Sequence, residues 1–151
     1  MTSLEMHRVH QRIAAGKQAP AVYKAMAAFD RSIELDSQLR ELIKIRASQL
    51  NGCAYCLDLH TRDARAAGED ERRLATLAGW REAPFFTDRE RAALALTDAV
   101  TRLGEHGVTD EVWNAAAAQF EEPELAQVLW AITAINAWNR IGVATHLQPE
   151  L

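Results

Sequence analysis

Apolar residues recur at spacings of three and four along almost the whole chain, and no stretch alternates between apolar and polar residues. This spacing is typical of amphipathic helices, whereas a half-buried strand would alternate. Glycine and proline, which interrupt helices, account for only 7 and 4 of the 151 residues. We therefore expect an all-α protein, and the length favours a single domain over residues 1–151.

Start and stop signals divide this pattern into separate helices. The predicted helices cover residues 4–15, 20–33, 37–50, 53–67, 70–78, 88–103, 110–120 and 123–146, with an irregular segment over 79–86. Asn51-Gly52 closes one helix, because both residues tolerate the left-handed backbone found after a helix. Thr87-Asp88-Arg89-Glu90 is the pattern of a capping box, in which Thr87 and Glu90 satisfy orphan backbone donors reciprocally.

The last predicted helix is apolar nearly all round and includes Trp130, Ile135 and Trp138. A helix without a polar face is buried in a core or against another subunit, and the sequence leaves both alternatives open. Asn136 and Asn139 interrupt its apolar surface. Because buried amides need partners, we expect them to make hydrogen bonds between helices or between subunits, or to support a site.

Composition excludes several classes of protein. Apolar residues make up 48% and charged residues 25% of the chain, which is a globular balance rather than a disordered one. The net charge of −4 gives no basic surface for nucleic acid. No apolar stretch approaches the roughly 20 residues of a membrane span, and residues 1–8 lack the apolar core of a secretory signal. We expect a cytoplasmic protein with no nucleic-acid or membrane partner.

The two cysteines, Cys53 and Cys56, lie three residues apart. A disulfide that closes so short a loop would stabilise the fold by roughly 2 kcal/mol at best. Disulfides that serve as scaffolds join distant segments instead. This pair therefore indicates chemistry or metal binding rather than a structural cross-link.

The spacing from Cys53 to Cys56 and on to His60 places all three side chains on one face of a helix. Cys53 would lie at the helix N-terminus, where unpaired N–H groups and the helix dipole favour a thiolate. His60, one turn beyond Cys56, could accept the proton of that thiol. Cys53 would then be within reach of a sulfenic acid on Cys56 and could close a disulfide.

Glu41 lies on the preceding predicted helix, about 16 Å from the turn at Gly52 along the helix axis. His60 lies roughly 12 Å beyond the turn on the following helix. If the two helices are antiparallel, Glu41 is level with His60 to within one turn. It could then orient the far imidazole nitrogen, directly or through a water.

Other interpretations of these residues remain open. The cysteines could be two small buried side chains. A zinc site could use Cys53, Cys56 and His60, with Glu41 or water as the fourth ligand. A dithiol protein that exchanges disulfides without reducing peroxides would need the same cysteine pair.

The pattern E-x11-C-x2-C-x3-H, filled by Glu41, Cys53, Cys56 and His60, resembles the core of AhpD-like alkyl hydroperoxidases of the carboxymuconolactone decarboxylase superfamily. The stretches 51–56 and 135–140 are also typical of its single-domain members. The resemblance implies a helical bundle with a two-helix C-x-x-C hairpin, assembled as a trimer or hexamer. A family peroxidase has a second histidine between its cysteines, where this chain has Tyr55.

The resemblance also implies an activity. Cys56 would be the peroxidatic cysteine and Cys53 the resolving one, with Glu41 and His60 as a water-linked proton relay. We therefore predict a thiol-dependent peroxidase that reduces small organic hydroperoxides and needs no cofactor or metal. The predicted partner is an external dithiol reductant of the lipoyl type. The alternatives are a disulfide-exchange protein and a zinc-binding helical module.

Overall fold

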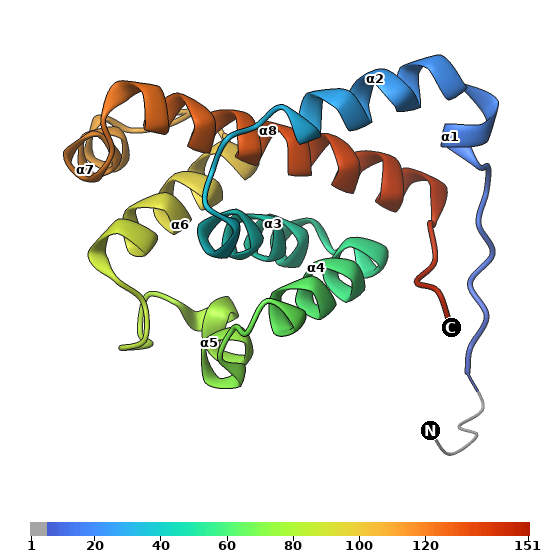
Figure 1. The fold of residues 1–151 in the computed structure, drawn as a ribbon, viewed down its shortest axis with the longest axis horizontal. Coiled ribbons are helices and arrows are strands. Elements are labelled where there is room, and N and C mark those ends of the chain that lie inside the picture. The colour runs from blue at the N-terminus through green and yellow to red at the C-terminus, as the bar shows by residue number, and fades with distance from the viewer. Residues whose placement is uncertain (1–5) are drawn as a thin grey trace.

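A computed structural model describes residues 6–151, and within that part of the chain it contains helices but no strand. The elements are α1 (Ala15–Gln18), α2 (Pro20–Arg31), α3 (Ser37–Asn51), α4 (Ala54–Ala66), α5 (Glu71–Thr76), the 3-10 turn η1 (Leu77–Gly79), α6 (Asp88–Thr101), α7 (Asp110–Gln119) and α8 (Glu122–Thr145). Figure 1 shows α8 running along the length of the molecule, with α2 beside it. The all-α prediction is confirmed.

Helix α3 occupies the middle of the bundle and packs on α4, α6 and α8 (Figure 1). The apolar side chains that it buries are Leu39, Leu42, Ile43, Ile45 and Ala47. Of these, Leu39, Ile43 and Ala47 share one core with apolar side chains of α8, namely Leu125, Val128, Ile132 and Ile135. Burial of one Leu or Ile side chain stabilises a fold by about 1.5–3 kcal/mol, so this core fixes α3 firmly against α8.

The helix ends follow the signals in the sequence. Asp36 caps α3 by accepting a hydrogen bond from the Leu39 N–H at 3.0 Å. Gly52 ends that helix with a left-handed backbone, φ 68°. The capping box at α6 is complete: Thr87 Oγ1 accepts from the Glu90 N–H at 3.1 Å, and the Glu90 carboxylate accepts from the Thr87 N–H at 2.9 Å.

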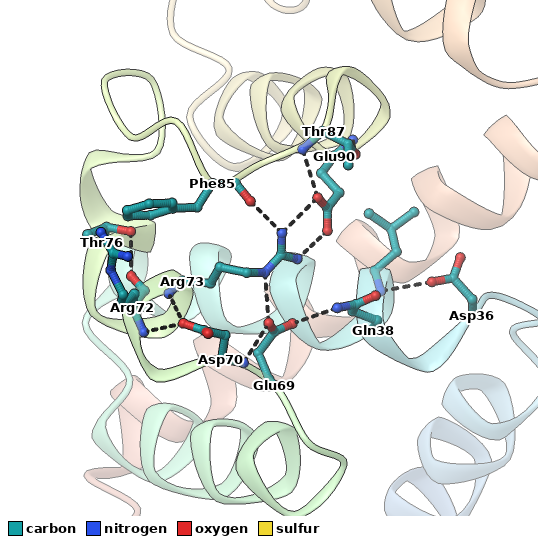
Figure 2. Close-up of polar contacts among 11 residues, drawn as sticks. Asp36, Gln38, Glu69, Asp70, Arg72, Arg73, Thr76, Phe85, Thr87 and Glu90 are labelled. Atoms are coloured by element: carbon teal, nitrogen blue, oxygen red, sulfur yellow. Dashed lines mark hydrogen bonds and ion pairs between the residues drawn. The ribbon is translucent and has the colours of Figure 1, made fainter.

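A polar cluster centred on Arg73 connects α3, α5 and the start of α6 (Figure 2). The guanidinium of Arg73 donates to both carboxylate oxygens of Glu90, to Glu69 at 2.7 Å and to the carbonyl of Phe85 at 2.6 Å. Glu69 also accepts a hydrogen bond from Gln38 of α3. Burial alone would raise the pKa of Glu90, but the hydrogen bond and charge of Arg73 outweigh it and lower that pKa. The cluster therefore joins α3, α5 and α6 through buried charge.

The predicted helix over residues 4–15 is wrong for the part that the structure describes, and residues 4 and 5 lie outside that part. Residues 6–14 are not helical, and only the short α1 follows them. Met6, Val9 and Ile13 are 60%, 41% and 57% exposed, so no neighbouring surface buries an apolar face there. An isolated helix of this length is marginal in water without such a surface.

Helix α8 combines a buried face with exposed apolar residues. Its buried face packs in the core, whereas the side chains of Trp130, Ile141 and Val143 are exposed on the surface of the single chain. Its end was predicted correctly: His146 follows the helix in a left-handed conformation, φ 54°. None of the helices between residues 6 and 151 combines the length and apolarity that a membrane crossing requires.

Candidate active site

The site is built on the hairpin formed by α3 and α4. Gly52 reverses the chain directly after α3, which makes Cys53 the N-cap residue of α4 and places Cys56 in its first turn. The apolar contacts of α3 with α8 hold this turn against the C-terminal part of α8. The helix boundary at Asn51-Gly52 was predicted, and it puts the cysteine pair at the start of α4.

The two thiols lie together in a buried position. Their sulfur atoms are 2.6 Å apart, and both cysteines are free. Cys53 is 2% exposed and Cys56 is 4% exposed. The sequence predicted that the two sulfurs share a side, and the structure brings them into direct contact.

Contact between the thiols shifts both of their pKa values. The hydrogen bond with the Cys56 thiol, with further help from the backbone of Cys56, lowers the pKa of Cys53 to about 6 against the opposing effect of burial. The same hydrogen bond, followed by burial, raises the pKa of Cys56. At neutral pH the pair therefore holds one thiolate and one thiol.

Glu41 and His60 meet across the hairpin as the helix arithmetic predicted. The Nδ1 atom of His60 lies 3.2 Å from the Oε2 atom of Glu41, and both side chains are largely buried. Positive charge on His60 also contributes to the lowered pKa of Cys53. With Nδ1 engaged by Glu41, the Nε2 atom is the nitrogen left for proton exchange.

Helix α8 supplies two further residues to the thiol pair. The Asn139 side chain adds to the lowering of the Cys53 pKa and opposes part of the rise in the Cys56 pKa. Gly142 lies against the sulfurs themselves, because a Cβ atom built on it would be 2.8 Å from Cys53 Sγ. The thiol pair therefore packs directly on the α8 backbone.

Asn136 and Asn139 make hydrogen bonds between helices, as one of the predicted alternatives required. The Nδ2 atom of Asn51 donates to the side-chain oxygens of Asn136 and Asn139 at 2.9 and 3.0 Å. Asn139 in turn donates to Ser48 at 3.0 Å, and Asn136 donates to Thr101 at 3.0 Å. These amides connect α3, α6 and α8 beneath the cysteine pair.

A cavity of about 640 Å³ opens next to the thiols. Cys56 and His60 both line it, whereas Cys53 is not among its lining residues. Most of the other walls are apolar or aromatic and come from Tyr23, Tyr55, Leu59, Trp138, Ile141 and Leu147. Cys56 is therefore the sulfur that a molecule in the cavity would meet.

The structure does not unite the ligands of the predicted zinc alternative. Within residues 6–151, the group of three potential metal ligands whose donor atoms all lie within 4.8 Å of one another consists of Glu41, His60 and Asp63. Neither cysteine belongs to that group. His60 is thus paired with carboxylates rather than with the sulfurs, and Asp63 is a neighbour of the pair that the sequence analysis did not identify.

Gly142 is a second residue at the site that was not predicted from the sequence. A glycine inside a helix costs about 1 kcal/mol relative to alanine, so one within a long apolar helix indicates close packing. Gly142 is the single glycine of α8 and lies one turn after Asn139. That signal was present in the sequence, but what packs on Gly142 depends on the tertiary structure.

Comparison with known proteins places the chain in a family. Residues 20–99 match the profile of the carboxymuconolactone decarboxylase family. The chain is 38% identical over 137 residues to the uncharacterized protein YdfG of Bacillus subtilis, and the alignment covers 89% of this chain and 93% of YdfG. It is 33% identical over 117 residues to the uncharacterized protein YnjA of Escherichia coli, and the alignment covers 77% of this chain and 63% of YnjA.

Solved structures agree with this placement. ATU0492 from Agrobacterium tumefaciens, a protein of unknown function and candidate antioxidant defence protein AhpD, superposes with a TM-score of 0.90 at 38% identity over 94% of this chain and 99% of that one. The debrominase Bmp8 shares the fold at 20% identity, with a TM-score of 0.78 over 89% of this chain and 74% of its own. The chain therefore belongs to the carboxymuconolactone decarboxylase family, as an AhpD-like member.

Proposed function

We propose that the protein is a thiol peroxidase that reduces organic hydroperoxides through a Cys53–Cys56 dithiol–disulfide cycle. The observation that carries this proposal is the position of Cys56. It lines an apolar cavity together with His60, and its sulfur touches that of Cys53. A nucleophile, a base and a resolving thiol thus meet where a substrate can enter.

The first step needs the thiolate on Cys56. The pair holds one proton at neutral pH, and its transfer from Cys56 to Cys53 across their contact leaves the charge on the sulfur that faces the cavity. Cys56 then attacks the terminal peroxide oxygen and the O–O bond breaks. The alkoxide that leaves takes a proton from the His60 imidazolium, so the products are an alcohol and a sulfenic acid on Cys56.

Glu41 acts on this step through His60. Its carboxylate lies 3.2 Å from Nδ1, which fixes the orientation of the ring. This leaves Nε2 as the nitrogen that exchanges protons with the reacting atoms. Glu41 is thus a positioning residue, whereas His60 is the catalytic acid and base.

Two further steps close the cycle. The Cys53 thiol attacks the sulfenic acid, and a disulfide forms with release of one water. An external dithiol then reduces that disulfide by exchange and becomes a disulfide itself, returning one proton to Cys53 and one to His60. The sum is hydroperoxide plus dithiol giving alcohol, water and the oxidised reductant.

Steady-state consumption of cumene hydroperoxide in the presence of excess dihydrolipoamide tests this proposal. We expect continuous turnover by the unmodified chain and none by either Cys53→Ser or Cys56→Ser. Arg62→Ala, which removes an exposed side chain of α4 outside the site, is the matched control and should keep full activity. Failure of the unmodified chain to turn over with every dithiol tried would contradict the proposal.

Disulfide exchange without peroxide reduction is the second candidate. The lowered pKa of Cys53 favours it, because thiolate is the reactive form in disulfide exchange. This candidate predicts one oxidation by peroxide without turnover, together with rapid exchange with a model disulfide. The steady-state assay therefore separates the two functions.

A further inference from the structure

One wall of the cavity comes from a part of the chain that is remote in sequence from the cysteine hairpin. Residues 11–17, which we name the strap, contribute Gln11, Ala14, Ala15, Gly16 and Lys17 to the cavity lining. In Figure 1 the N-terminal segment passes alongside the C-terminal end of α8 before it enters α1. The cavity is therefore closed on this side by a segment outside the helical core.

Arg12 fastens the strap to the end of α8. Its backbone N–H donates to the Thr145 carbonyl at 2.7 Å, and its guanidinium donates to the Ala144 carbonyl at 3.1 Å. The last four carbonyls of a helix lack partners within the helix. Those of Gly142 and Val143 accept from the residues that follow α8, so Arg12 supplies the remaining two. A cation is also favoured at a helix C-terminus.

Beyond Arg12, the strap contacts the aromatic wall of the cavity. A Cβ atom on Gly16 would come within 2.8 Å of the Tyr23 ring, so the strap backbone packs on that ring. The Tyr23 ring in turn meets the Trp138 ring edge-on, with centroids 5.6 Å apart. The docked strap thus continues directly into the apolar surface that faces Cys56.

We propose that the strap, fastened by Arg12, is a specificity wall that selects ligands with an apolar body of aromatic size for reaction at Cys56. The cavity of about 640 Å³ lies in the size range of small-molecule sites. An apolar body gains free energy by leaving water for these walls, whereas hydrogen peroxide has no apolar surface to bury. The identity of the ligand as a hydroperoxide rests on the proposed function, but the wall itself does not.

Arg12→Ala tests the wall, with Arg8→Ala as the matched control. Arg8 lies three residues before the strap and is not a cavity-lining residue. The first readout is alkylation of Cys56 in a Cys53→Ser background, with N-phenylmaleimide as the aromatic reagent and iodoacetamide as the small polar one. We expect Arg12→Ala to lower the ratio of their rates about tenfold, and Arg8→Ala to leave it unchanged. An unchanged ratio in Arg12→Ala would overturn the proposal.

The second readout is the ratio of kcat/KM for cumene hydroperoxide to that for hydrogen peroxide in the chain with both cysteines. Arg12→Ala should lower it by a similar factor, through a higher KM for cumene hydroperoxide. If the alkylation ratio falls but the unmodified chain reduces no peroxide, the selective role of the strap is supported and only the proposed peroxidase function is contradicted. If peroxide is turned over but Arg12→Ala does not change the preference for cumene hydroperoxide over hydrogen peroxide, the selective role of the strap is contradicted and the proposed peroxidase function is supported.

Discussion

The Cβ position of Gly142 lies 2.8 Å from Cys53 Sγ and 3.9 Å from Cys56 Sγ. Helix α8 therefore meets the thiol pair at the one residue of that helix without a side chain. Any larger residue there must displace a sulfur or move the helix backbone. This contact links the long core helix to the chemistry of the α3–α4 hairpin.

Gly142→Ala should destabilise the fold even though alanine is the better helix former. Crowding in a packed site costs about 1–3 kcal/mol, which exceeds the gain of about 1 kcal/mol in helix propensity. Urea unfolding measures the free energy change. In a Cys53→Ala background the crowded sulfur is gone, so the same substitution should become neutral or stabilising. An equal loss in both backgrounds would show that the sulfur contact is not the cause.

The thiol pair should ionise well below the range of an ordinary cysteine, whose pKa is about 8.5. Because the pKa of Cys53 is lowered to about 6, the thiolate absorbance of the reduced chain should rise as pH increases through about 6. Cys56→Ala removes the largest cause of that shift and should move the midpoint upward. Retention of a midpoint near 6 in Cys56→Ala would contradict the assigned cause. Cys53→Ala, the matched variant, should show no ionisation near pH 6.

His60→Gln should lower kcat by about 10²-fold, the usual contribution of a positioned acid or base. Glu41→Gln should lower kcat by a smaller factor, because Glu41 acts on the reaction only through the orientation of His60. The two losses should not add in the double variant, since they remove parts of one unit. Glu34→Gln, which changes an exposed carboxylate three residues before α3, is the control and should have no effect. Additive losses would place Glu41 outside the relay.

Arg73→Met should destabilise the fold by on the order of 3 kcal/mol, because it leaves the buried Glu90 carboxylate without its partner. The pKa of Glu90 is lowered in the folded chain, so this pair stabilises the fold fully above the ordinary carboxyl pKa of about 4.3. The contribution of the Arg73–Glu90 pair to the stability of the fold is lost as the pH falls below that value and Glu90 becomes protonated. Urea unfolding at several pH values measures both effects. Arg62→Met, which breaks an exposed pair, should cost less than about 1 kcal/mol.

Local signals in the sequence predicted the scaffold of the site. Asn51-Gly52 fixes the end of α3, and the three-and-four spacing from Cys53 to His60 fixes which side chains share a face of α4. Together with the rise per residue, these features were enough to predict the meeting of Glu41 and His60. Each of these relationships depends on one hairpin of adjacent helices.

Features that depend on distant segments could not be predicted in the same way. The N-terminal residues have a helical pattern, yet residues 6–14 are not helical, and Arg12 pairs with the end of α8 instead. Gly142 and the cavity walls become recognisable only once α8 and the strap are placed beside α4. The reductant and the trimeric or hexameric assembly stay predictions, because they concern molecules beyond a single chain.

The role of Cys56 as the attacking sulfur is tested most directly by locating the sulfenic acid formed by peroxide. Each single-serine variant is treated with one equivalent of cumene hydroperoxide in the presence of dimedone, and the adduct is mapped by mass spectrometry. We expect an adduct on Cys56 in Cys53→Ser and little or none on Cys53 in Cys56→Ser. An equal or greater yield on Cys53 would contradict this expectation, because the attacking sulfur would then be the one outside the cavity.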